Sequence, residues 1–176
     1  MTKPFLAALL CLACGAAPVG TPPPSYVLHV PLPSPAALHD QTVEWAARWS
    51  AATGIDVSVH DGDPLDAGAI PVTFESGLLT DEGKPACGLT SISTWHDSGR
   101  VRTNSIKLVP SAPSGCSGWG YVLGHEMGHM LCPTCEHAPE GVFSERLTLG
   151  RQHKIDHYTL ATVCAGAPCP VFAPEL

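Results

Sequence analysis

The sequence predicts an α+β fold, in which one long helix precedes a small sheet and two more helices follow it. Three observations support this prediction. Apolar residues recur at helical spacing after residue 35, three segments between residues 55 and 109 have strand-like patterns, and residues 118–131 are apolar on most faces, as in a central helix. The 176 residues fit a single domain, since domains usually contain ~50 to ~250 residues.

The N-terminal segment is expected to direct export. Met1 to Lys3 give a positive start, and the apolar run Phe5 to Ala13 is too short to span a bilayer, so residues 1–13 are interpreted as an export signal. Leu10-Cys11-Leu12-Ala13-Cys14-Gly15 resembles the end of a bacterial lipoprotein signal. This resemblance implies a lipidated Cys14 and membrane attachment in the cell envelope, in the outer membrane or periplasm; ordinary secretion is the alternative.

Proline and cysteine contents fit an exported protein. Residues 14–35 are proline-rich and predict an extended tether, which leaves residues 36–176 as the folded domain. An even set of cysteines within that domain predicts up to three disulfides in an oxidising compartment. These cysteines are Cys87, Cys116, Cys132, Cys135, Cys164 and Cys169.

Charge excludes some partners. The chain has 9 Lys and Arg against 16 Asp and Glu, a net charge of -7, so it offers no basic face for nucleic acid. No run of Lys and Arg indicates attraction to an anionic membrane surface. We expect a monomer.

The elements follow in order from local patterns. Ser34-Pro35 begins a helix whose inner face carries Leu38, Thr42, Trp45, Trp49 and Ala52, and Gly54 ends it. Both tryptophans are expected to pack in the core. Strands are predicted at the alternating segment 55–60, at Ile70 to Phe74 and at Val101 to Val109, then helices at Gly118 to Leu131 and Gln152 to Cys164.

The candidate catalytic and metal-binding residues lie on the predicted helix from Gly118 to Leu131. His125-Glu126-Met127-Gly128-His129 fits the H-E-x-x-H pattern, in which histidines one turn apart can bind the same zinc ion. Glu126 can then take a proton from a water bound to zinc as that water attacks a peptide carbonyl. Catalytic zinc usually has three protein ligands, so a third must be supplied elsewhere.

The chain from Leu38 to Cys164 resembles the metzincin zinc peptidases, especially matrixin-like forms, most specifically at Gly124 to Leu131. Gly141-Val142-Phe143-Ser144 is similar to the family's Met-turn beneath the zinc, with Phe143 in place of methionine, and Ile155-Asp156-His157-Tyr158 would open the last helix. The resemblance implies a twisted, mostly parallel sheet and an endopeptidase whose extended substrate pairs with an edge strand, sought between Cys87 and Thr94. A protein or peptide is therefore the expected substrate.

The third ligand departs from the family pattern, H-E-x-x-H-x-x-G-x-x-H. Cys132 occupies the glycine position, Cys135 occupies the histidine position, and His137 follows two residues late. We expect His137 to be the ligand, with a Cys132–Cys135 disulfide, or a bond to another cysteine, stiffening the loop. Cys135 as a thiolate ligand and Glu145 as a carboxylate ligand are the competing interpretations.

Two other functions remain compatible with the sequence. A surface lipoprotein that kept this fold without activity would act as a binding protein, which the altered loop and Phe143 motivate. A thiol oxidoreductase is the second, because Cys132-Pro133-Thr134-Cys135 matches C-x-x-C. Such a pair usually opens a helix, whereas this one follows a helix, which disfavours the oxidoreductase.

Overall fold

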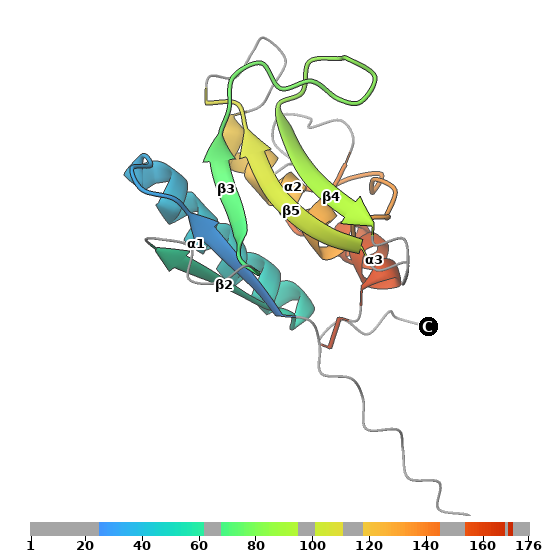
Figure 1. Ribbon diagram of the computed structural model, residues 1–176. Coiled ribbons are helices and arrows are strands. Elements are labelled where there is room, and N and C mark those ends of the chain that lie inside the picture. The colour runs from blue at the N-terminus through green and yellow to red at the C-terminus, as the bar shows by residue number, and fades with distance from the viewer. Residues whose placement is uncertain are drawn as a thin grey trace, which may run out of the picture.

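The computed structural model describes residues 25–61, 68–94, 101–110, 118–144, 154–167 and 169–170. Its elements are β1 (Ser25–Val30), α1 (Ala36–Thr53), β2 (Asp56–Asp61), β3 (Ile70–Phe74), β4 (Gly88–Thr94), β5 (Val101–Leu108), α2 (Trp119–Leu131) and α3 (His157–Gly166) (Figure 1). The predicted α+β class is confirmed. Residues 1–13, predicted to be an export signal, and Cys14 lie outside the described residues, and within the described part no helix is long and apolar enough to cross a membrane.

Five strands form one mostly parallel sheet in the order β2-β1-β3-β5-β4. β1 pairs in parallel with β2 and β3, and β3 pairs in parallel with β5. β4 is antiparallel to β5 and forms one edge of the sheet. An edge strand therefore occupies the segment between Cys87 and Thr94 where one was sought.

One strand corrects the sequence interpretation. Ser25–Val30, assigned to the proline-rich tether, forms β1 and pairs with strands on both sides. Prolines flank this segment without interrupting it, so its backbone donors are free to join the sheet. Leu28 and Val30 lie in the core, at 0% and 3% exposure. Burial of these apolar side chains outweighs the influence of the neighbouring prolines.

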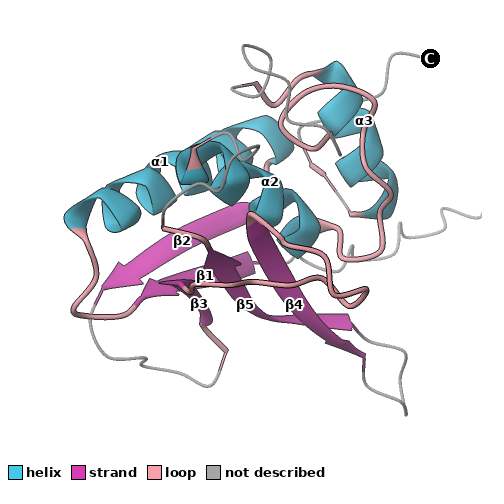
Figure 2. Ribbon diagram, turned by 90° about the horizontal axis from the view of Figure 1, so that it is seen from above, coloured by secondary structure: helices cyan, strands magenta, loops and turns pink. Residues whose placement is uncertain are grey.

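The helices α1 and α2 lie together on one face of the sheet (Figure 2). Trp45 and Trp49 of α1 are buried, and their indole N–H groups donate to the carbonyl oxygens of Gly120 and Gly124 on α2, at 2.6 Å and 3.1 Å. A Cβ atom on Gly124 would lie 2.6 Å from the Trp45 ring, so only glycine permits this approach. The predicted core role of both tryptophans is confirmed, and it fixes the position of α2.

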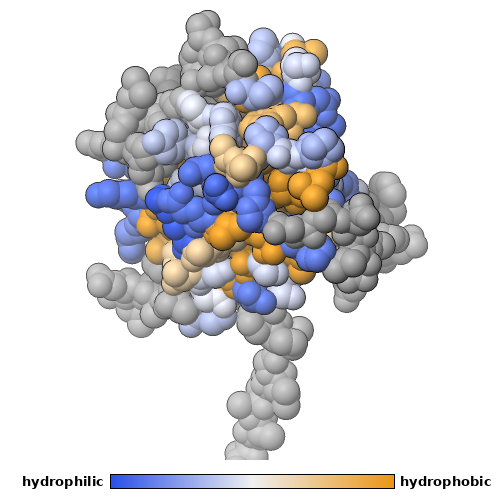
Figure 3. Space-filling model, turned by 90° about the vertical axis from the view of Figure 1, so that its left-hand side faces the viewer, coloured by the Kyte–Doolittle hydropathy of each residue, from blue (hydrophilic) through white to orange (hydrophobic). Residues whose placement is uncertain are grey.

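The opposite face of α1 is exposed to solvent. Glu44 and Arg48 form an ion pair one turn apart, and Arg48 lies 4.8 Å from the centre of the Trp45 ring. Figure 3 shows the side of the molecule that carries α1, where hydrophilic side chains gather beside separate apolar patches. This division into a buried and a polar face agrees with the amphipathic pattern of the helix.

The final helix begins later than predicted. Residues 154–156 are not helical, and α3 starts at His157. The Asp156 carboxylate accepts a hydrogen bond from the Thr159 backbone N–H at 2.9 Å and so caps the helix. Since a capping aspartate has an extended backbone, the helix cannot include the residues before it.

Candidate metal centre

The two histidines of the H-E-x-x-H pattern lie on α2, one turn apart on the same face. His125 is buried with 8% exposure, and the His129 side chain is partly buried. Their ring centres are 4.9 Å apart. α2 packs against α1 and the sheet, so the backbone that carries His125 and His129 is held in place.

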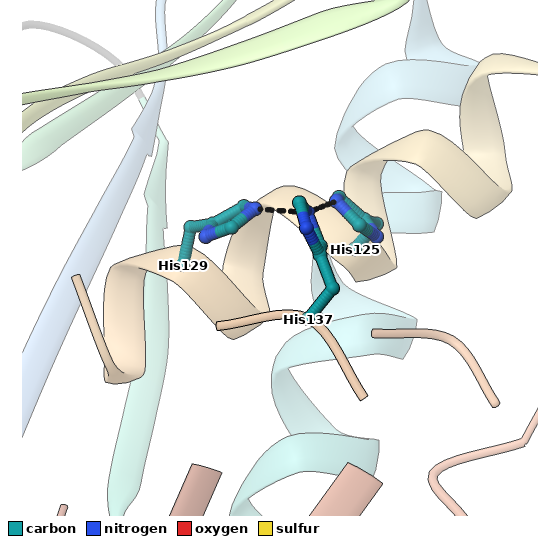
Figure 4. A group of neighbouring side chains, drawn as sticks. All are labelled: His125, His129 and His137. Atoms are coloured by element: carbon teal, nitrogen blue, oxygen red, sulfur yellow. Dashed lines mark hydrogen bonds between the residues drawn. The ribbon is translucent and has the colours of Figure 1, made fainter. Parts of the chain in front are cut away.

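His137 approaches them from the loop that follows α2. Its Nε2 atom lies 3.1 Å from His129 Nε2 and 3.2 Å from His125 Nε2 (Figure 4). Nitrogen ligands 2.0–2.1 Å from a tetrahedral zinc ion lie about 3.3 Å apart. The three histidines are therefore brought together, as predicted, in a group that could hold a metal ion.

A disulfide shapes this return loop. α2 ends as the Cys132 N–H donates to the Gly128 carbonyl oxygen at 2.9 Å, and Cys132 and Cys135 are bonded to each other. His137 follows Cys135 by two residues and points toward His125 and His129. Because Cys135 is in the disulfide, it does not supply a thiolate ligand here. The other candidate ligand, Glu145, lies outside the described residues.

The disulfide is a packed structural element. Cys132 is only 1% exposed, and a Cβ atom on Gly166 of α3 would lie 2.2 Å from its Sγ atom. Cys135 is partly exposed, so what weighs against the oxidoreductase interpretation is the position of the pair, which follows α2 and does not open a helix. A second disulfide joins Cys164 to Cys169, and Cys87 is also disulfide-bonded.

A hydrogen bond outside the metal centre orients His125. Its Nδ1–H donates to the carbonyl oxygen of Val142 at 3.0 Å. A carbonyl can only accept, so we assign the hydrogen to Nδ1, which leaves the Nε2 lone pair of the neutral ring directed toward the other histidines. Metal-binding histidines almost always have such a partner on their second nitrogen.

Val142 belongs to the turn that resembles a Met-turn. Gly141 has φ 82°, and the Ser144 N–H donates to the Gly141 carbonyl oxygen at 3.3 Å. The next residue, Phe143, is fully buried, and its ring centre lies 4.7 Å from that of His129 and 5.5 Å from that of His125. Phenylalanine therefore packs beneath the three histidines.

The neutral state of the helix histidines favours metal binding. Burial is the largest cause that lowers the pKa of His125 to about 4, followed by the charge of His137, while the bond to Val142 acts in the opposite direction. Burial, then the charges of His125 and His137, lower the pKa of His129 to about 3. Both rings are thus unprotonated at neutral pH and have free lone pairs.

Glu126 lies beside the histidines against the edge strand. Burial raises the pKa of its carboxyl to about 7, although hydrogen bonds with Thr90 act in the opposite direction. The Thr90 hydroxyl lies 2.7 Å from Glu126 Oε2. A pKa near neutrality suits a group that must both accept and release a proton.

These groups share one cleft of about 340 Å³. Glu126 and the three histidines form part of its wall, while Thr90 and Ile92 of β4 line it from the edge strand. The sequence interpretation did not single out Thr90 or Gly88, since nothing in the local pattern of β4 indicates contact with α2. Of the remaining paired histidines, His157 is exposed and does not join this group, and His153 lies outside the described residues.

No protein-family model matches the sequence, and no curated protein matches it either.

Proposed function

We propose that this chain is a zinc-dependent endopeptidase of the metzincin type, with His125, His129 and His137 as the zinc ligands and Glu126 as general base and acid. The observation that carries the proposal is the position of His137 Nε2, 3.1 Å from His129 Nε2 and 3.2 Å from His125 Nε2, beside a buried glutamate. Zinc is favoured because imidazole ligands in a tetrahedral arrangement suit it.

The bound metal would supply Lewis-acid chemistry, lowering the pKa of a water molecule and polarising the substrate carbonyl. Glu126 accepts a proton from the attacking water and returns it to the departing amine. His125 and His129 hold their positions because α2 is packed against α1, and the Val142 carbonyl fixes the His125 ring. His137 completes the set from a loop closed by a disulfide.

The substrate site is proposed to follow β4. A strand at the edge of a sheet offers unpaired backbone groups that an extended peptide can join. β4 occupies that edge, and its residues Thr90 and Ile92 line the same cleft as Glu126. This arrangement would bring a peptide bond past the metal centre.

We also propose that the protein is exported to an oxidising compartment. The disulfides fit an oxidising compartment, which agrees with an export signal over residues 1–13 and attachment through a lipidated Cys14, or with secretion. The protein would then act on peptides or proteins in the cell envelope or outside the cell.

The test compares wild-type protein with Glu126→Ala in zinc content and in cleavage of casein or gelatin. Glu82→Ala is a matched control, because Glu82 is exposed and pairs with Lys84 at the surface, away from the cleft. We expect all three proteins to hold one zinc ion and Glu126→Ala alone to lose at least about 100-fold in rate.

The outcomes separate the candidate functions. Zinc-loaded wild-type protein that cuts no peptide library would refute the peptidase and favour a binding protein with a metal-stabilised fold. A purified protein that binds no zinc would refute the metal centre itself.

A further inference from the structure

Thr90 makes a contact that the sequence pattern does not indicate. It lies on β4, which packs against α2, and its hydroxyl group is 2.7 Å from Glu126 Oε2 and 2.8 Å from the Glu126 backbone oxygen. A hydroxyl has one proton and donates to one acceptor at a time. The carboxylate oxygen is the nearer of the two, and when Glu126 is ionised it is the favoured partner, because bonds to ionised acceptors are about twice as strong as neutral ones.

Gly88 shapes the other side of the same carboxylate. A Cβ atom at this position would lie 2.9 Å from Glu126 Cγ, 3.0 Å from Glu126 Oε1 and 2.4 Å from Val122 Cγ1. Glycine and threonine two residues apart on a strand point to the same face. The Glu126 side chain therefore packs between bare backbone at Gly88 and the hydroxyl group of Thr90.

We propose that Thr90 is a positioning residue, which holds the Glu126 carboxylate by one oxygen and leaves the other to exchange a proton with water. This inference rests on the proposed peptidase function. A glutamate side chain has several rotatable bonds, and reaction rates fall when a reacting group strays from its productive position. The edge strand would thus act on the chemistry directly, in addition to lining the cleft.

Two substitutions separate this role from simple packing. Thr90→Val keeps the shape and removes the hydroxyl, whereas Thr90→Ser keeps the hydroxyl. Ser93→Ala is the matched control, since Ser93 lies on the same strand and its hydroxyl bonds to Asn104 away from the cleft. We expect Thr90→Val to lower kcat by about 10- to 100-fold with little change in KM or zinc content, and Thr90→Ser and Ser93→Ala to stay near wild type.

A second measurement does not depend on activity. In metal-free protein, a double-mutant cycle between Thr90→Val and Glu126→Ala in urea unfolding measures the coupling between the two side chains, as the difference between the carboxylate bond in the wild-type background and the backbone bond that replaces it in the Glu126→Ala background. We expect the two substitutions to be non-additive, by a factor of about five or more in the unfolding equilibrium constant.

Several results would overturn the inference. Additive effects in the cycle would mean that the two side chains do not interact in solution. Unchanged kcat in Thr90→Val, or equal losses in Thr90→Val and Thr90→Ser, would leave only packing. Zinc-loaded wild-type protein without activity would overturn the peptidase proposal and this role with it, while an active wild type with a Thr90→Val variant of the same kcat would overturn the Thr90 role alone.

Discussion

Replacing both cysteines of the return loop by alanine, Cys132→Ala with Cys135→Ala, is expected to weaken zinc binding beyond its effect on folding. This disulfide lies between the helix that carries two histidines and His137, which follows Cys135 by two residues. Without it the loop has more conformations in the metal-free protein, and zinc binding must order it. The second disulfide, Cys164–Cys169, lies outside this loop and serves as control.

The expected magnitudes follow from the two loops. The sequence separations are 3 and 5 residues, and closure of either loop stabilises the folded state by about 2 kcal/mol in the chain-entropy model. Both double variants should therefore lose similar global stability. Ordering the backbone of one residue costs about 1–2 kcal/mol, so each loop residue freed in the first variant weakens zinc affinity about 5- to 30-fold.

The assay has two parts. Urea unfolding in the presence of a chelator measures stability, and competition with a chromogenic chelator measures zinc affinity. A loss of affinity of about fivefold or more in the Cys132→Ala, Cys135→Ala protein, with near wild-type affinity in the Cys164→Ala, Cys169→Ala protein, agrees with the reasoning. Equal affinities in the two variants would refute it, because the disulfide would then contribute only to folding.

The remaining predictions concern packing and pH. Gly124→Ala should lower the free energy of unfolding by about 1–3 kcal/mol, because its Cβ would lie 2.6 Å from the Trp45 ring; a urea titration with unchanged stability would contradict this. Phe143→Ala should cost about 3–5 kcal/mol in the same assay, since the ring is fully buried, and a loss under 1 kcal/mol, about the cost of a surface change, would count against its core role. In metal-free protein, stability should fall as pH drops from 6.5 toward 4, because the unfolded state binds protons at the ordinary pKa of 6.5 while His125 and His129 stay at about 4 and about 3. The Glu126 carboxyl, whose pKa is raised to about 7, binds its proton more readily in the folded state and so raises stability on acidification, but it is one group against two histidines. Urea titrations that show stability rising on acidification would exclude this account.

Prediction succeeded where local geometry decides the outcome. Histidines four residues apart on a helix face the same way whatever surrounds them, so the pairing of His125 and His129 needed no tertiary information. The same holds for the apolar face of α1 and for its termination at Gly54, whose φ of 75° suits glycine.

Prediction failed or stayed open where distant segments decide it. The proline content around Ser25–Val30 indicated a tether, yet pairing with β2 and β3 makes it a central strand. The sequence left His137, Cys135 and Glu145 as competing ligands, because the path of a loop depends on what anchors it. Because Cys135 is bonded to Cys132, it cannot act as a thiolate ligand. The loop after α2 places His137 beside His125 and His129.

By itself, then, the sequence determined the α+β class, the helix that carries the candidate chemistry and two of its three histidines, since all of these depend on periodic patterns within one segment. Only the tertiary structure decided which group joins them, and only it placed Thr90 and Gly88 of the edge strand against the Glu126 carboxylate. Contacts between segments 36 residues apart in sequence have no local signature, because they depend on how a strand and a helix pack.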